Sequence, residues 1–223
     1  MDGKRVLVTG ATGGVATAFI EGVHRAGAEL VLTGFGQARL DELAAQYGAA
    51  VCEADLSTAG GVAALIEATG AVDGVVHLTG GFAMGRVADA MIADYDRMMD
   101  LNLRSLFQVA RAYVPILRER DGFLVAIGAG PGLSLGAPHM GLYAAAKAGV
   151  IALMRSIAAE EPRVRPIVLI PQGAIDTPAN RAALPAVDPT TWIDPAELAA
   201  AVVFAATRSV RGRVLELQIL PPA

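Results

Sequence analysis

The sequence predicts an α/β fold: a single doubly wound domain whose mainly parallel sheet has seven strands and is flanked by helices. Short β-branched runs alternate with longer helical stretches along the chain, and this alternation implies right-handed βαβ units. Six of the seven strand candidates are continuous apolar runs, as expected for strands covered on both faces. The length of 223 residues fits one domain, which we expect to span residues 1–223.

The strand candidates are short runs rich in Val, Leu and Ile. In order they are Arg5–Thr9, Glu29–Thr33, Ala50–Glu53, Gly74–Leu78, Phe123–Ile127, Arg165–Ile170 and Val214–Ile219. The helix candidates lie between them, at Val15–Arg25, Gln37–Gln46, Val62–Thr69, Ala93–Arg120, Leu142–Glu160 and Pro195–Thr207. The last helix has a clear start, because Asp194 is a good N-cap and Pro195 suits the first helical position.

Composition excludes several classes of protein. With 54% hydrophobic and 18% charged residues, the chain has enough apolar material for a well-buried core. Its net charge of −4 argues against nucleic-acid binding. No apolar run is long enough to span a membrane, and the start shows no signal-peptide layout. The single cysteine, Cys52, forms no internal disulfide, and we expect no metal site and a cytoplasmic location.

A glycine-rich turn follows the first strand. The segment Thr9–Phe19 reads "TGATGGVATAF", and glycines at a strand-to-helix turn let the backbone approach a pyrophosphate at the helix N-terminus. The common G-x-G-x-x-G spacing is not met, so a purely structural turn is the alternative. The residues we expect at the cofactor phosphates are Gly10, Thr12, Gly13, Gly14 and Val15.

The choice between NAD and NADP stays open. An acidic residue at the end of the second strand would bond the ribose hydroxyls and favour NAD, but Gly34 and Phe35 stand there. Arg39 either reaches a 2′-phosphate or is solvated on the next helix. After the third strand, Asp55 and Leu56 either line the adenine site or, for Asp55, cap the following helix.

A tyrosine and a lysine stand four residues apart in an alanine-rich segment. The chain has four tyrosines, and Lys4 and Lys147 are its two lysines. In a helix Tyr143 and Lys147 lie one turn apart on the same face, near the carboxyl ends of the strands, where such sheets bind ligands. A nearby ammonium lowers the pKa of a phenol, so Tyr143 can exchange a proton with a substrate oxygen while hydride moves to or from carbon. The alternative is an exposed tyrosine and a solvated lysine.

Together these motifs make nearly the whole chain resemble the short-chain dehydrogenase/reductase family. The glycine turn, Asp55, Asn102 and the Tyr-x-x-x-Lys pair follow the family's order and approximate spacing. The resemblance implies that Tyr143 is the proton donor or acceptor and that Lys147 bonds the nicotinamide ribose. It also implies that Asn102 holds a water in a proton relay, the alternative being a polar residue in a helix kink.

The resemblance assigns further cofactor contacts. Thr177, in "GAIDTP", would bond the nicotinamide carboxamide, with Ile175 beside it. Thr79 and Gly80 would follow the fourth strand in place of the family's Asn-Asn-Ala-Gly motif, which here reads His77-Leu78-Thr79-Gly80.

The chain also departs from the family pattern. The family's catalytic serine stands about thirteen residues before the tyrosine, where this chain has Ala129 and Gly130, and Ser134 is too close. The segment "IPQGAIDT" is one residue longer than usual. These departures resemble a serine-lacking branch that includes dihydropteridine reductase, whose substrate is a quinonoid pterin. Asn102 and the Thr-Gly turn look more like general ketoreductases, so no pterin substrate is assigned.

The substrate side is less well marked. Phe82, Gly130 and His139 are the candidates for the pocket, whereas His24 and His77 are interpreted as helix and strand-end residues. The stretch from about 171 to 194 is rich in Pro, Asp and Thr and has no clear element, as is typical of a binding loop or lid.

The leading hypothesis is an NAD(P)-dependent oxidoreductase acting on a small carbonyl/alcohol pair or a pterin-like imine. One alternative is a 3-oxoacyl-carrier-protein reductase, which needs a basic docking patch; the candidates are Arg86, Arg104 and Arg181. Another is a non-catalytic dinucleotide-binding sensor or scaffold. The expected partners are a small-molecule substrate and further copies of the chain in a homodimer or homotetramer built on the long helices, with no nucleic acid and no membrane.

Overall fold

The computed structural model describes residues 1–222 and contains one seven-stranded sheet, in which every neighbouring pair of strands is parallel. The spatial order is β3-β2-β1-β4-β5-β6-β7, so the predicted fold class is confirmed. The strands are β1 (Arg5–Thr9), β2 (Glu29–Gly34), β3 (Ala50–Glu53), β4 (Gly74–His77), β5 (Phe123–Ile127), β6 (Arg165–Pro171) and β7 (Glu216–Ile219).

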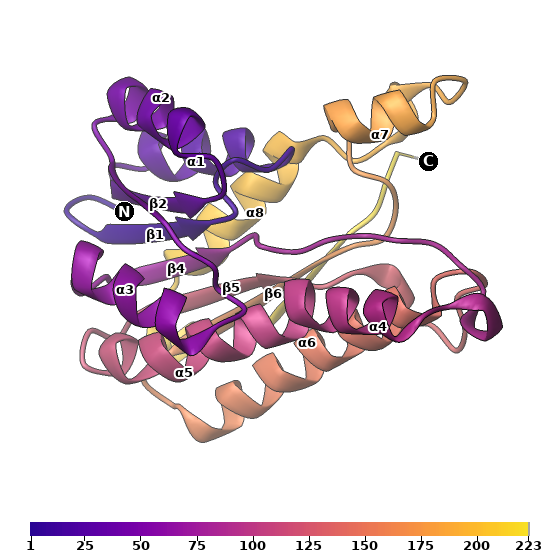
Figure 1. The fold of residues 1–223 in the computed structure, drawn as a ribbon. Coiled ribbons are helices and arrows are strands. Elements are labelled where there is room, and N and C mark those ends of the chain that lie inside the picture. Colours follow the sequence, from indigo (N-terminus) through magenta and orange to yellow (C-terminus); the bar gives the residue numbers. More distant parts are fainter. Residues whose placement is uncertain (223) are drawn as a thin grey trace.

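Helices cover both faces of the sheet (Figure 1). They are α1 (Ala16–Arg25), α2 (Gln37–Tyr47), α3 (Ala59–Thr69), α4 (Ile92–Met99), α5 (Ser105–Arg118), α6 (Gly141–Glu160), α7 (Pro178–Ala183) and α8 (Pro195–Ala206). Asp194 caps α8 as predicted, because its carboxylate accepts a hydrogen bond of 2.8 Å from the Ala196 N–H.

Alternating strand residues feed two separate apolar cores. Residues such as Val6 and Val8 of β1 face one way and pack with α1, α2 and α8. Leu7 faces the other way and packs with α3, α5 and α6. Side chains of a strand point alternately to its two faces, so a continuous apolar run is what a strand between two cores requires. This is why the apolar runs could be interpreted as buried strands.

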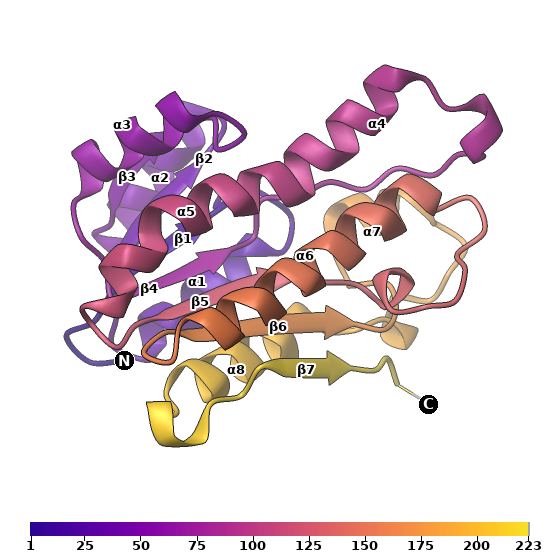
Figure 2. The same ribbon diagram turned by 90° about the horizontal axis from the view of Figure 1, so that it is seen from below.

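The connections reverse direction between β1 and β4. From β1 the chain proceeds outward to β2 and β3, then crosses back to β4 on the other side of β1. At the end of β1, Thr9 is opposite Thr33 of β2 on one side and His77 of β4 on the other. In sheets of this type the ligand crevice lies at the carboxyl ends of the strands, where the order reverses. The helices α4 and α7 lie at one end of the molecule in both views (Figures 1 and 2).

Two predicted elements differ from the structure. The single helix expected over Ala93–Arg120 is two helices joined by a π-helical segment, Asp100–Arg104. The side chain of Asn102 donates a hydrogen bond of 3.0 Å to the Met98 carbonyl, and π segments of this kind occur frequently at functional sites. The stretch 171–193, expected to be irregular, contains α7 and a β-bridge between Ile175 and Ile193.

The helix α6 is long and apolar enough to span a membrane by length and composition alone, with a mean hydropathy of 1.4. In the structure its apolar face packs on the sheet through Val150, Ile151, Met154 and Ile157. We therefore interpret α6 as a core helix.

Candidate active site

The glycine turn brings the β1–α1 connection close to the end of β4. Gly10 has a φ of +63°, and a Cβ placed on it would lie 2.8 Å from the Thr79 backbone nitrogen, so another residue there would force the two segments apart. The Gly13 N–H donates to the Gly10 carbonyl at 2.9 Å, which closes the turn. Helix α1 begins immediately afterwards and has no side-chain cap. The Ala16 N–H donates to the Gly13 carbonyl at 3.1 Å, and no side chain competes with an anion for the other N–H groups at this helix start.

Most residues predicted to bind cofactor line one cavity of about 220 Å³ at the reversal point of the sheet. Predicted residues among its lining are Gly10, Thr12, Gly13, Asp55, Leu56, Thr79 and Gly80. Gly34 and Phe35 of the β2 end lie in the same wall. The cavity thus joins the ends of β1, β2, β3 and β4, which are far apart in the sequence.

The structure decides whether Asp55 caps helix α3. The carboxylate accepts hydrogen bonds from the backbone and hydroxyl of Ser57, at 2.9 and 2.7 Å. The cap of α3 is instead Thr58, whose hydroxyl oxygen accepts from the Gly61 N–H at 3.0 Å. The alternative that Asp55 caps the helix is therefore wrong, and its exposed carboxylate lies in the cavity wall.

Lys147 is buried at the centre of the site. Its ammonium donates a hydrogen bond of 2.8 Å to the carbonyl of Ile127, at the end of β5. An ammonium has three N–H donors. A Cβ placed on Gly80 would stand 3.5 Å from Lys147 Nζ, so the amine lies beside Gly80, which lines the cavity. Burial lowers the pKa of Lys147 to about 8. The alternative of a solvated lysine is wrong.

Tyr143 lies one turn before Lys147, as predicted. The lysine nitrogen is 5.8 Å from the centre of the tyrosine ring, and Phe82 packs edge-on against that ring at a centroid distance of 4.9 Å. Burial raises the pKa of Tyr143 to about 12. The expectation of a lowered pKa is therefore wrong for the protein alone, because burial disfavours the charged phenolate. At neutral pH the phenol carries its proton.

Asn102 occupies the π segment between α4 and α5. Its amide nitrogen donates to the carbonyls of Met98 and Gly81 at 3.0 and 3.1 Å, and its amide oxygen accepts from the Gly81 N–H at 3.2 Å. The alternative of a polar residue in a helix kink thus has support, because Asn102 stands at a distortion of the helix and ties it to the loop after β4. Its role in holding a water of a proton relay stays a prediction. A Cβ on Gly80 would lie 2.9 Å from its oxygen, close to Lys147.

His77 connects the glycine turn to the same π segment. Its Nδ1 lies 3.0 Å from the Thr9 hydroxyl and its Nε2 lies 3.2 Å from the Ser105 hydroxyl. Thr9 also accepts a hydrogen bond from the Thr79 hydroxyl at 3.0 Å, and Ser105 donates to the Leu101 carbonyl at 2.8 Å. These directions require a neutral ring with its proton on Nε2. Burial first, and the charge of Lys147 second, lower the pKa of His77 to about 3.

The nicotinamide end of the predicted site comes from the loop after β6. Thr177 is buried, and its Cβ would lie 3.5 Å from a Cβ on Gly14, so it touches the glycine turn. Its hydroxyl oxygen accepts from the Asn180 N–H at 3.2 Å, which caps α7. The hydroxyl proton remains available as a donor. Ile175 stands two residues earlier, where the loop pairs with Ile193.

The three predicted substrate residues do not gather in one cavity. Phe82 lies against Tyr143, whereas His139 lines a second cavity of about 250 Å³ with Met84 and Arg86. Beside Gly130 lies the carboxamide of Gln172, whose Oε1 would be 2.5 Å from a Cβ there. A side chain at Gly130 would therefore have to displace the carboxamide of Gln172.

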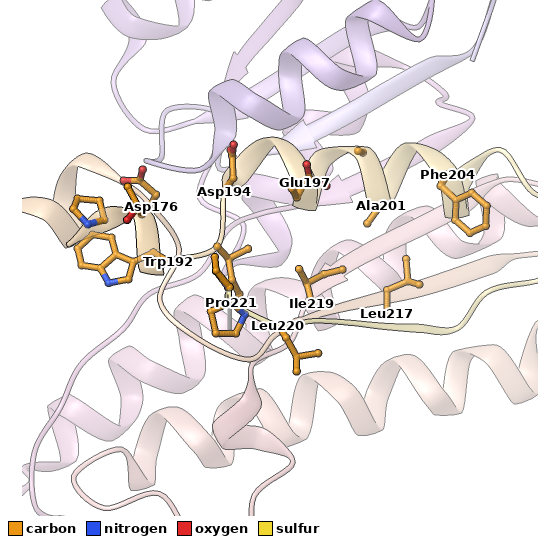
Figure 3. Close-up of a pocket in the computed structure, with 15 residues that line it drawn as sticks. Asp176, Trp192, Asp194, Glu197, Ala201, Phe204, Leu217, Ile219, Leu220 and Pro221 are labelled. Carbon is orange, nitrogen blue, oxygen red and sulfur yellow. The ribbon is translucent and has the colours of Figure 1, made fainter. Parts of the chain in front are cut away.

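A larger cavity, about 790 Å³, lies elsewhere, between α8, β7 and the segment that follows β7 (Figure 3). Its labelled walls include Trp192, Phe204 and Leu217, and the acidic side chains Asp176, Asp194 and Glu197 lie along one rim. Asp176 belongs to the loop after β6, but no proposed catalytic residue lines this cavity. Size alone therefore does not identify the active site.

The residues fit a nicotinamide dinucleotide. A turn that tolerates no Cβ at Gly10 and an uncapped helix start suit a pyrophosphate. Lys147 has N–H donors beyond the one bonded to Ile127, which suits ribose hydroxyls, and Thr177 has a free donor for an amide oxygen.

Comparison with known proteins agrees with this geometry. The family model described as enoyl-(acyl carrier protein) reductase matches residues 10–212. A solved short-chain dehydrogenase/reductase family protein superposes with a TM-score of 0.88 at 28% identity, over 98% of this chain and 96% of its own. The chain belongs to the short-chain dehydrogenase/reductase family. It is an NAD(P)-dependent oxidoreductase, and the alternative of a non-catalytic sensor is not supported.

Individual relatives give the same picture. An uncharacterised oxidoreductase of Staphylococcus epidermidis is 27% identical over 98% of this chain and 97% of its own length. Nodulation protein G of Rhizobium sp. (strain N33) is 34% identical over 72% of this chain and 68% of its own. The alcohol dehydrogenase from the archaeon Thermococcus sibiricus, complexed with 5-hydroxy-NADP, superposes with a TM-score of 0.84 at 26% identity, over 97% of this chain and 95% of its own. None of these matches points to a branch resembling dihydropteridine reductase.

Sequence reasoning missed three residues that the structure brings into the site: Glu53, His77 and Gln172. Glu53 ends a half-exposed strand and reaches the β2–α2 turn only through the strand register. His77 was interpreted as a strand-end residue, and its two partners lie 68 and 28 residues away. Gln172 lies in "IPQGAIDT", a segment that the sequence marked only as one residue longer than usual.

Proposed function

We propose that this chain is a reductase in which Tyr143 delivers a proton to the substrate oxygen or nitrogen. The observation that carries the proposal is a half-buried phenol whose pKa is raised to about 12, one helical turn from a buried lysine beside the dinucleotide cavity. At neutral pH the phenol is protonated, so it is ready to act as the acid in a reduction.

The bound nicotinamide would supply the hydride. The residues of this chain hold it and manage the proton. Lys147 would bond the nicotinamide ribose while its hydrogen bond to the Ile127 carbonyl fixes its position. Thr177 would donate to the carboxamide, and the residues Gly10 to Val15 would hold the phosphates. Asn102, whose amide bridges Met98 and Gly81, would anchor the water through which Tyr143 regains its proton.

The missing serine bears on the substrate. A hydroxyl at Ala129 or Gly130 would hydrogen-bond the substrate oxygen as negative charge develops, and one such donor is typically worth about 3 kcal/mol. Without it, substrates that develop little oxyanion charge are favoured. We therefore expect small activated carbonyls, such as vicinal diketones, or a pterin-like imine, in line with the resemblance to serine-lacking reductases.

A 3-oxoacyl-carrier-protein reductase would need free arginines near the site. Each of the three candidates is paired with a nearby acid: Arg86 with Asp89 at 3.9 Å, Arg104 with Asp100 at 2.8 Å, and Arg181 with Asp176 at 2.6 Å. These pairs leave little net positive charge for an acidic carrier protein, so they favour a small free substrate.

The remaining expectations concern organisation. We propose one domain, a substrate loop at about 171–194, and a homodimer or homotetramer built on the long helices, in the cytoplasm. Ile92 on α4 and Phe107 on α5 are exposed by 77% and 48%, so these helices offer apolar surface for a second copy. Sedimentation of the purified protein tests the assembly, and a monomer at micromolar concentration would contradict it.

The function is tested with a substrate panel. Oxidation of NADH and NADPH is followed with a simple ketone, a vicinal diketone, an acetoacetyl thioester and a quinonoid dihydropterin. We expect turnover with the diketone or the pterin to exceed that with the simple ketone and the thioester. Highest efficiency with the thioester would favour the carrier-protein reductase, and no turnover with any of the four would count against the proposal.

A further inference from the structure

The adenosine end of the cavity lacks an acid on β2, and the structure shows why. A Cβ placed on Gly34 would lie 2.9 Å from the Thr12 hydroxyl oxygen and 3.2 Å from the Thr12 nitrogen. A side chain at this position would therefore require the Thr12 hydroxyl and the β1–α1 turn to shift. The next residue, Phe35, is exposed by 59% and carries no charge.

An acid from the neighbouring strand reaches the same place. Glu53, the last residue of β3, is in register with Gly34. Its Oε1 accepts a hydrogen bond of 2.7 Å from the backbone N–H of Gly36. Gly36 has a φ of +92° and is the N-cap residue of α2, where no side chain of its own caps the helix.

This hydrogen bond places a negative charge where a phosphate would otherwise be attracted. Free N–H groups and the positive dipole end at a helix N-terminus favour anions. The carboxylate of Glu53 already bonds one of these N–H groups, directly after the cavity residues Gly34 and Phe35. A 2′-phosphate at this turn would meet that carboxylate, whereas the two free hydroxyls of an adenosine ribose can donate to it.

The arginine nearest this turn in the sequence, Arg39, is already paired with an acid. Arg39, in the first turn of α2, forms an ion pair with Glu42 at 2.6 Å. Asp55, in the wall of the same cavity, adds a second carboxylate. The balance of charge around the adenosine end is thus negative.

We infer that Glu53 is a specificity-determining residue that makes this enzyme select NAD(H) over NADP(H), with its carboxylate held at the β2–α2 turn by Gly36. The inference rests on the proposed use of a nicotinamide dinucleotide in the cavity. It takes the discriminating acid from β3, whereas the sequence pattern looks for it on β2.

The test measures binding and not turnover. Dissociation constants for NADH and NADPH are determined by fluorescence titration of the wild type and of Glu53→Gln. The glutamine keeps an oxygen for the Gly36 N–H and removes the charge. We expect the wild type to bind NADH about tenfold or more tightly than NADPH, from repulsion between a carboxylate and a phosphate a few ångströms apart near the surface. In Glu53→Gln the ratio should fall mainly because NADPH binds more tightly.

Two further variants separate charge from structure. Glu67→Gln removes one negative charge from an exposed position near the carboxyl end of α3. It should leave the ratio of NADH to NADPH affinity unchanged. Glu53→Asp keeps the charge but is too short to reach Gly36 in the same way, and it should still prefer NADH. If Glu53 served only to stabilise the turn through its bond to Gly36, Glu53→Gln would keep that bond and leave the ratio of the two affinities unchanged.

The outcomes are distinguishable. A wild type that prefers NADPH, or a Glu53→Gln variant that changes both affinities by the same factor, overturns the inference and leaves the reductase proposal standing. A wild type that binds neither cofactor overturns the proposed function, and the inference with it.

Discussion

Replacing His77 should change how the stability of the protein responds to acid. The ring is 3% exposed and its pKa is lowered from 6.5 to about 3. A histidine whose folded pKa is depressed resists protonation, so the unfolded chain binds more protons than the folded one between the two values. Stability is therefore complete above about pH 6.5 and is lost as the pH falls toward 3.

The magnitude follows from the two pKa values. Between about pH 7.5 and pH 5, protonation of the unfolded histidine alone lowers the free energy of unfolding by about 2 kcal/mol. In His77→Asn this contribution disappears. The variant loses hydrogen bonds to Thr9 and Ser105 and is less stable at both pH values. That loss cancels when the change in the free energy of unfolding between the two pH values is taken within each protein.

The assay is urea unfolding at the two pH values for the wild type, His77→Asn and the control His24→Gln. His24 is exposed on α1. We expect the wild type and the control to lose about 2 kcal/mol more than His77→Asn on acidification. The same loss in all three proteins would refute the conclusion that burial and the charge of Lys147 keep His77 neutral in the folded protein.

Three further predictions concern the site. Burial lowers the pKa of Lys147 to about 8, so cofactor affinity measured by titration should weaken as the pH rises through that value. In Lys147→Arg the affinity should be weaker at neutral pH but should not change over the same pH range. A wild-type affinity that does not change with pH would contradict the role of Lys147 in binding the cofactor. Ala129→Ser should raise kcat/KM for a simple ketone more than for a diketone, by up to about 10²-fold if the new hydroxyl acts as the missing donor. Gly130→Ser must first displace Gln172. Equal gains on both substrates would argue against the idea that the missing serine hydroxyl sets the preference for activated substrates. Limited proteolysis should cut within 171–194 first and be slowed by cofactor plus substrate, and equal cutting with and without ligands would contradict a closing loop.

The fold was largely predictable because burial leaves a strong pattern. A strand such as β1 packs into cores on both faces of the sheet, through Val6 on one face and Leu7 on the other. The sequences of such strands are therefore continuous apolar runs. Local rules also worked where one residue decides the structure, as with the Asp194 cap. The π segment at Asp100–Arg104 was not predicted as a break between two helices, although a kink at Asn102 was one interpretation, because a helical pattern continues on both sides of it.

The site was predictable where its members lie close in the sequence. Tyr143 and Lys147 are one helical turn apart, so their proximity follows from helix geometry. Glu53 and Gly36 meet because β2 and β3 pair in a particular register, which no local pattern specifies. The pKa of Tyr143 was predicted in the wrong direction because its shift comes from burial, a tertiary property that the local sequence does not reveal.

The central claim is that Tyr143 supplies the proton, and one measurement tests it most directly. Turnover with the best substrate of the panel is compared in the wild type, Tyr143→Phe and the control Tyr95→Phe, with the affinity for NADH measured in each. Tyr95 is exposed by 48% on α4. The account predicts that Tyr143→Phe binds NADH nearly as the wild type does but loses about 10²-fold or more in kcat, while Tyr95→Phe is unaffected in both. Turnover of Tyr143→Phe within a few-fold of the wild type would contradict the account.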